Sequence, residues 1–206
     1  MTLTGTRSGT SSAESATARR KGRVMTSSSE QHDPNQPART DNPGDVPAGR
    51  PPALARLDGL VGEWDMEASF GAGYFGAGSP PVTSGGGRTT FDWLDGGFFL
   101  IQRFTAGNPA APRGIAIIGT GPSPETFSQH YYDSRGVARV YQMSLQDGVW
   151  RLWREAPGFW QRFTGVISAD GSTIKGAWEG SADGSGWKHD FGLTYTKISR
   201  PVARPQ

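Results

Sequence analysis

The chain of 206 residues contains no cysteine. This absence excludes disulfide bonds, a catalytic thiolate, and zinc or iron–sulfur centres held by cysteine. The sequence also lacks a Gly-x-Ser-x-Gly elbow, a phosphate-binding loop, a His-Glu-x-x-His pair and an EF-hand loop. The familiar signatures of hydrolases, nucleotide binding, zinc proteases and calcium binding are therefore missing. What remains for acid–base or metal chemistry is three His and the carboxylates.

Aromatic side chains are missing from the first fifty residues, and branched aliphatic ones are scarce there. Such a segment buries too little apolar surface to offset the entropy lost on ordering. We therefore predict that residues 1–50 form a disordered tail, with Met25 as an alternative start. All seven Trp, ten Phe and five Tyr follow residue 60, which predicts one core. We expect one domain over residues 51–199 and a short tail over 200–206.

Basic residues are unevenly placed. Residues 57–198 hold 11 Lys and Arg against 14 Asp and Glu, so the net charge of +2 comes from the flanks. The one basic cluster, residues 19–23, is interpreted as a solvated charge run rather than a nucleic-acid patch. The sequence shows neither a secretory apolar region nor a run of membrane-spanning length. We expect a cytoplasmic protein with neither a nucleic-acid nor a membrane partner.

Short aromatic segments separated by Gly, Pro or Asp-Gly turns follow one another from residue 62 to residue 198. In the first segment, residues 62–70, apolar and acidic side chains alternate, which is typical of a half-buried strand. About ten such segments, with no long helical pattern between them, predict an all-β fold: a single up-and-down antiparallel β-barrel. Residues 71–87 are expected to form a loop before a strand at 88–94. A short N-terminal helix over residues 52–60 is expected to cover one barrel end.

Two segments carry a family resemblance. Gly62-Glu63-Trp64 opens the first expected strand after a short helix, and residues 187–197 read WKHDFGLTYTK on the last. Here the chain resembles the calycin superfamily of lipocalins, fatty-acid-binding proteins and nitrobindins. It is most similar to a bacterial lipocalin-like family of unknown function. The resemblance covers roughly residues 57–198 and implies a barrel in which Trp64 plugs the closed end.

Within this superfamily, nitrobindins bind haem through a His on the last strand. The matching position of this chain is Gly192, and Met66 and Ala68 replace two glycines of the nitrobindin first-strand motif. The resemblance therefore implies the fold and not the haem.

Candidate ligand-binding residues are aromatic or imidazole side chains on the expected strands, because Trp and a few polar groups commonly line small-molecule cavities. They are Trp93, His130, Tyr132, Trp153, Trp160 and His189. His130 and Tyr132 share one strand face and Gln129 and Tyr131 the other, so one pair points inward. By the same alternation, His189 points inward if Phe191 and Leu193 do.

The leading hypothesis is binding of a small apolar or amphipathic molecule in an aromatic-lined barrel cavity. No catalytic residue, metal site or cofactor is predicted, and a homodimer is left open. An inward Arg for an acidic head group has candidates in Arg103, Arg151 and Arg162. One alternative is a barrel isomerase, cyclase or hydrolase that uses His130 or His189 in acid–base catalysis. Another is haem binding of the nitrobindin type through His130.

Overall fold

The computed structural model describes residues 49–123 and 125–198. These residues form one short helix and ten strands. The elements are η1 (Pro52–Leu60), β1 (Gly62–Phe70), β2 (Val82–Trp93), β3 (Leu100–Thr105), β4 (Gly114–Thr120), β5 (Phe127–Asp133), β6 (Ala138–Gln146), β7 (Val149–Arg154), β8 (Trp160–Ile167), β9 (Thr173–Ser181) and β10 (Lys188–Lys197). Apart from Gly49 and Arg50, the predicted N-terminal tail lies outside the described residues, as does the tail at 200–206, so their disorder stays a prediction.

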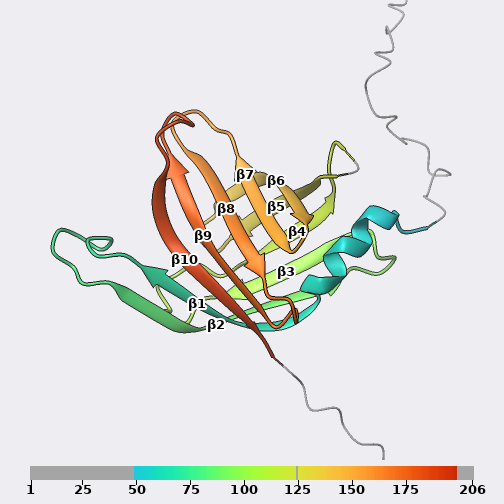
Figure 1. Cartoon of the computed structure of the whole chain (residues 1–206), viewed down its shortest axis with the longest axis horizontal. Helices are drawn as coiled ribbons and strands as arrows, with labels where there is room; N and C mark the ends of the chain where they lie inside the picture. Colours follow the sequence, from blue (N-terminus) through green and yellow to red (C-terminus); the bar gives the residue numbers. More distant parts are fainter. Residues whose placement is uncertain (1–48, 124, 199–206) are drawn as a thin grey trace, which may run out of the picture. The chain divides into compact units, whose positions relative to one another are not determined.

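The strands close into a barrel (Figure 1). Each pairs antiparallel with its neighbour in sequence, and β1 also pairs with β10. The predicted up-and-down all-β barrel is confirmed. The β6–β7 turn shows how a tight turn connects two paired antiparallel strands. Asp147 (φ 50°) and Gly148 (φ 73°) both adopt left-handed conformations, which match the twist of paired strands.

The helix η1 covers one end of the barrel. It is a 3-10 helix, in which residues three apart lie in one row. Leu54, Leu57 and Leu60 have this spacing and are fully buried. The Trp64 indole Nε1 donates to the Leu60 carbonyl at 2.8 Å, which ties η1 to β1. We call this the closed end, and the opposite end the mouth.

The expected position of Trp64 is confirmed. Its Cα partner on β10 is Lys197, whose Nζ lies 5.0 Å from the indole ring centroid. Within the described ranges, no helix is long and apolar enough to cross a bilayer.

Strand β2 begins at Val82, within the segment that the sequence predicts as a loop. Glycine disfavours strands, so the run Gly85 to Gly87 hides this extension. The structure supplies the reason for Gly87. A Cβ there would lie 2.9 Å from the Met66 carbonyl oxygen on β1, so a side chain would separate the strands. A register shift between Met66 and Ala68 marks the same place.

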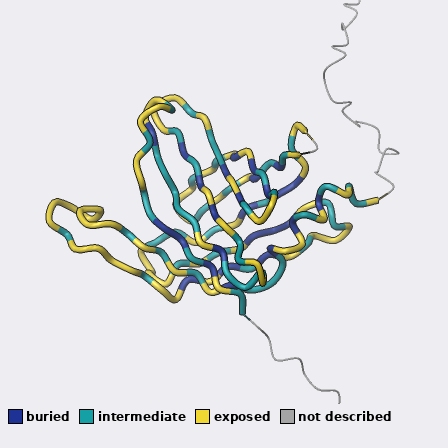
Figure 2. Tube along the Cα trace, in the orientation of Figure 1, coloured by how far each residue is buried: buried dark blue, intermediate teal, exposed yellow. Residues whose placement is uncertain are grey.

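Buried and exposed residues alternate along the strands (Figure 2). The buried ones pack aromatic rings against each other inside the closed-end half. Trp150 lies at their centre, with ring centroids 6.0 Å from Phe91, 5.2 Å from Phe163 and 5.9 Å from Tyr195. Aromatic side chains therefore form the packed core of this half of the barrel.

Candidate functional site

His130 and Tyr132 lie on the outer face of β5. Gln129 and Tyr131 are the inward pair: Gln129 is 4 % exposed and Tyr131 packs against the core. The His130 ring is exposed, with Nε2 3.2 Å from the Ser128 hydroxyl, and Tyr132 is 44 % exposed. Strand alternation allows only one of the two pairs to face inward. The packing shows that this pair is Gln129 and Tyr131.

His189 is also exposed, although Phe191 and Leu193 face inward. The expectation from strict alternation is wrong here, because the register of β10 against β9 shifts between His189 and Phe191. This bulge turns His189 to the outer face, opposite Glu179.

Of the three predicted tryptophans, Trp93 packs against the core at the closed end, whereas Trp153 and Trp160 lie outside it. Trp93 donates from Nε1 to the Asp58 carboxylate on η1 at 2.9 Å. Trp153 is half-buried on β7, between buried Leu152 and inward Arg154. Trp160 packs on the β9–β10 loop, where a Cβ added to Gly184 would lie 3.1 Å from its ring. The structure does not bring the six predicted residues together, and ligand contact by any of them stays a prediction.

The three arginines proposed for an acidic head group also face outward. Arg103 and Arg151 are exposed. Arg162 forms a two-point ion pair with Glu179, at 2.7 Å and 3.2 Å, and lies 4.1 Å from the Trp187 ring centroid. These cations are in solvent or already paired.

A different arginine faces inward near the mouth. Arg139 lies near the start of β6 and donates from Nη1 to Gln161 Oε1 at 2.7 Å. The Tyr141 hydroxyl donates to the same oxygen at 2.8 Å. Gln161 and Tyr141 are only 7 % and 3 % exposed, so the guanidinium is held over a buried polar pair. Burial, the largest influence, raises the pKa of Tyr141, which keeps the phenol protonated as a donor.

Arg154 adds a second cation at the mouth. It follows buried Trp150 and Leu152 at alternate positions of β7, and its Cα partner on β8 is Gln161. Its Nη1 donates to the Phe159 carbonyl at 3.2 Å, and its charge acts against the rise in the pKa of Tyr141. Among the described residues, neither Arg139 nor Arg154 forms an ion pair with a carboxylate. The mouth thus presents two inward cations without a protein anion.

A solvent-inaccessible carboxylate, that of Asp133, lies in one wall of the mouth. Asp133 accepts from the Tyr131 hydroxyl at 2.8 Å and from Arg135 Nη2 at 2.6 Å. The Arg135 hydrogen bond, more than any other contact, lowers the pKa of Asp133 far below its usual range. Tyr131 in turn stacks on Phe104, with ring centroids 5.5 Å apart. Because Arg135 satisfies Asp133, this carboxylate leaves Arg139 unpaired.

Gln129 adds a polar atom to the interior. Its Oε1 is buried without a hydrogen-bond partner. Buried polar atoms are rarely left unpaired, so this oxygen is available to a donor on a ligand. No group of three or more His, Asp or Glu side chains in the described segments could hold a metal ion.

A periodicity signal for Arg139 exists in the sequence. Tyr141, Met143 and Leu145 occur at alternate positions and predict the inward face of a strand. Extending that face backward by two residues reaches Arg139. Arginines in strands usually face solvent, so searching for one flanked by large apolar residues selected the outward candidates instead.

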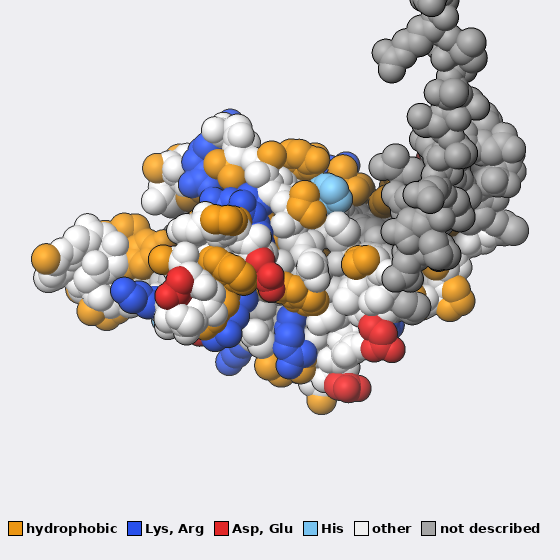
Figure 3. Space-filling view, turned by 90° about the horizontal axis from the view of Figure 1, so that it is seen from above, with side chains coloured by type: hydrophobic (Ala, Val, Ile, Leu, Met, Phe, Trp, Pro, Cys, Tyr) orange, Lys and Arg blue, Asp and Glu red, His pale blue; other side chains and the backbone are white. Residues whose placement is uncertain are grey.

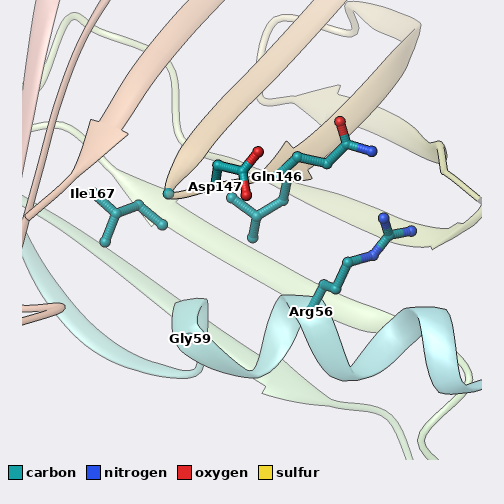
Figure 4. A pocket seen from close by; sticks show the side chains of 7 residues that line it. Arg56, Gly59, Gln146, Asp147 and Ile167 are labelled. Carbon is teal, nitrogen blue, oxygen red and sulfur yellow. The ribbon is translucent and has the colours of Figure 1, made fainter. Parts of the chain in front are cut away.

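A separate cavity of about 580 Å³ lies at the closed end, between η1 and the β6–β7 turn (Figure 4). Figure 4 shows the Arg56 side chain extending from η1 toward the side of the cavity that Gln146 lines. Two of its polar groups have other partners. The Arg56 guanidinium lies 5.0 Å from the Phe127 ring centroid, and Gln146 Nε2 donates to Glu125. We therefore place the candidate ligand site at the mouth, where the cations lack protein anions.

Comparisons with known proteins agree with the fold and name no function. No protein-family profile matches the sequence, and no curated protein matches it. Among solved structures, the chain is similar to the crystal structure of Rv2717c from M. tuberculosis, with a TM-score of 0.53 and 14 % sequence identity. The match covers 73 % of this chain and 99 % of that one. At 14 % identity the likeness extends to the fold alone.

Proposed function

We propose that the protein binds a small amphipathic molecule at the mouth of the barrel and catalyses no reaction. The observation that carries this proposal is the inward pair Arg139 and Arg154, which has no carboxylate partner among the described residues. The anionic group of the ligand contacts these guanidiniums, and its apolar part packs on the neighbouring aromatic side chains.

The physical support is the cost of keeping a cation half-buried. Removing a guanidinium from water is unfavourable unless an anion and hydrogen bonds replace the lost hydration. Arg139 already donates to Gln161 Oε1 through Nη1, and its guanidinium lies 5.0 Å from the Phe159 ring centroid, but no described carboxylate balances its charge. A planar guanidinium binds a carboxylate through two parallel hydrogen bonds, so a carboxylate fits this position well.

The positions of the imidazoles do not support the catalytic and haem hypotheses. Both require an imidazole near the ligand, and His130 and His189 lie on the outer face. The aromatic interior is compatible with binding of an apolar molecule without them.

The test is isothermal titration calorimetry with dodecanoate, an anionic amphiphile, and with dodecanol, its uncharged counterpart. Arg139→Gln keeps a hydrogen-bonding side chain and removes the charge. We expect it to weaken dodecanoate binding by about tenfold or more, since hydrogen bonds to charged groups contribute about 1.5–3 kcal/mol. Dodecanol binding should change little.

Arg103→Gln is the matched control, because Arg103 has the same charge on the outer face of β3. It should bind dodecanoate like the parent protein. No binding of either amphiphile to the parent protein, or an equal loss in both variants, would refute the proposal. Native mass spectrometry of protein purified from its own host then identifies the ligand class by mass.

A further inference from the structure

Aromatic side chains form a row from Arg139 to the opposite side of the barrel wall. The Tyr141 hydroxyl lies 3.5 Å from Arg139 Nη1, and its ring lies 5.5 Å from Trp178. Strand register then places Trp178, Phe191 and Phe70 side by side on β9, β10 and β1. The Phe191 and Phe70 ring centroids are 5.6 Å apart. Aromatic residues in ring contact or in adjacent strand register thus lead from the inward cation to the end of β1.

The row continues onto the connection between β1 and β2. The Tyr74 and Phe75 rings lie 4.7 Å and 5.1 Å from Phe70. They are 44 % and 61 % exposed, so this end of the row is open to solvent. In Figure 1 the β1–β2 hairpin projects beyond the neighbouring strands. We call Phe70, Tyr74 and Phe75 the aromatic lip.

The chain segment that carries the lip has no charged residue, although Asp190 on β10 interacts with the Tyr74 hydroxyl and, second to burial, raises the pKa of Tyr74. Residues 71–87 contain no Asp, Glu, Lys, Arg or His. Figure 3 shows this end of the molecule covered by hydrophobic side chains, uncharged other side chains and backbone, with charged side chains beginning closer to the barrel. Gly73 (φ 82°) and Gly76 (φ 129°) flank the two exposed rings in conformations that other residues rarely adopt. An exposed apolar surface held in a defined shape is typical of a contact site.

We propose that the aromatic lip binds the distal tail of a long single-chain amphiphile whose anionic group contacts Arg139. This inference rests on the proposed function. The ring centroids are 5.5 Å apart for Tyr141 and Trp178, 5.6 Å for Phe191 and Phe70, and 5.1 Å for Phe70 and Phe75, while Trp178 and Phe191 are cross-strand partners. A short chain ends over Trp178 or Phe191, and only a long chain reaches Phe75. The lip therefore selects for chain length, while Arg139 selects for charge.

The exposed area argues against a second copy of the chain as the occupant. An aromatic side chain buries about 150–250 Å², so two roughly half-exposed rings, Tyr74 and Phe75, offer about 200 Å². Each partner in a stable dimer contributes about 800 Å². The lip offers about a quarter of that area, which suits the end of one hydrocarbon chain.

The experiment measures the affinities of octanoate, dodecanoate and hexadecanoate by calorimetry. For the parent protein, we expect affinity to rise about fourfold per methylene through the whole series. Phe75→Ser should bind octanoate like the parent protein and hexadecanoate about tenfold more weakly. The matched control is Phe99→Ser, which removes a ring that is 45 % exposed at the closed end. It should match the parent protein for all three chains.

The outcomes separate the two proposals. If no chain binds the parent protein, the proposed function fails. If all chains bind and Phe75→Ser loses nothing with hexadecanoate, the lip proposal is overturned and the proposed function stands. An equal loss with octanoate also overturns it, because the effect then ignores chain length. Size-exclusion chromatography without ligand adds a last check: a dimer that Phe75→Ser dissociates would make the lip a protein interface.

Discussion

Replacing Trp64 with alanine is expected to remove much of the stability of the barrel. The indole is fully buried between η1 and the first and last strands, and its Nε1 donates to the Leu60 carbonyl at 2.8 Å. Truncating a buried Trp costs about 3–5 kcal/mol through lost packing and the cavity left behind. The unpaired Leu60 carbonyl adds about 1 kcal/mol.

The combined loss of about 4–6 kcal/mol is large against the 5–15 kcal/mol by which domains are typically stable. The assay is urea unfolding followed by far-ultraviolet circular dichroism. With a slope of about 2 kcal/mol per molar urea, the midpoint should fall by about 2–3 M. Trp64→Phe, which retains most of the volume and loses the hydrogen bond, should lie between the parent protein and Trp64→Ala.

Trp153→Ala is the comparison variant, because Trp153 is half-buried on the outer face. It should cost about 1 kcal/mol and shift the midpoint by about 0.5 M. Equal midpoints for Trp64→Ala and Trp153→Ala would refute the reasoning, since they would show that the contact between η1 and Trp64 contributes little. They would also argue against the structural role of Trp64 that the Gly62-x-Trp64 resemblance implies.

Three further perturbations follow from the fold. Asp133→Asn should lower stability by about 1–3 kcal/mol at neutral pH, because Tyr131 and Arg135 lose a charged acceptor. Because the pKa of Asp133 is lowered in the folded protein, its carboxylate stabilises the fold above about pH 4, and this stabilisation is lost as the pH falls. The urea midpoints of the variant and the parent protein should therefore converge in acid. A difference that stays constant with pH would contradict this. Gly62→Ala should cost about 1–3 kcal/mol, because Gly62 has φ 123° and alanine is strained there; an unchanged midpoint would show relaxation of the backbone. Removing residues 1–48 should leave the melting temperature unchanged in calorimetry, because this segment has no aromatic side chain with which to pack; a fall of several degrees would mean that it contributes to the fold.

The barrel could be predicted from the sequence because its determinants are local. Period-two alternation places Trp64, Met66 and Ala68 on one face, and Gly or Asp-Gly pairs end the strands at tight turns. The helix follows from three Leu at a spacing of three, which are the residues that the structure buries. Strand β2 is the exception. Its glycines disfavour a strand, and only the close approach of Gly87 to β1 explains why it pairs there.

The candidate site depended on the tertiary structure. Alternation defines two faces of a strand and does not say which one is inside, so His130 and Gln129 were equally eligible until packing placed Gln129 in the interior. At His189, a bulge in the pairing with β9 reversed the face that alternation implied. Arg139 became a candidate only when the closed barrel brought Gln161, 22 residues away, to its guanidinium. Local side-chain patterns determine strands and turns, whereas the groups that face one another across an interior are determined by register and closure, which no local pattern encodes.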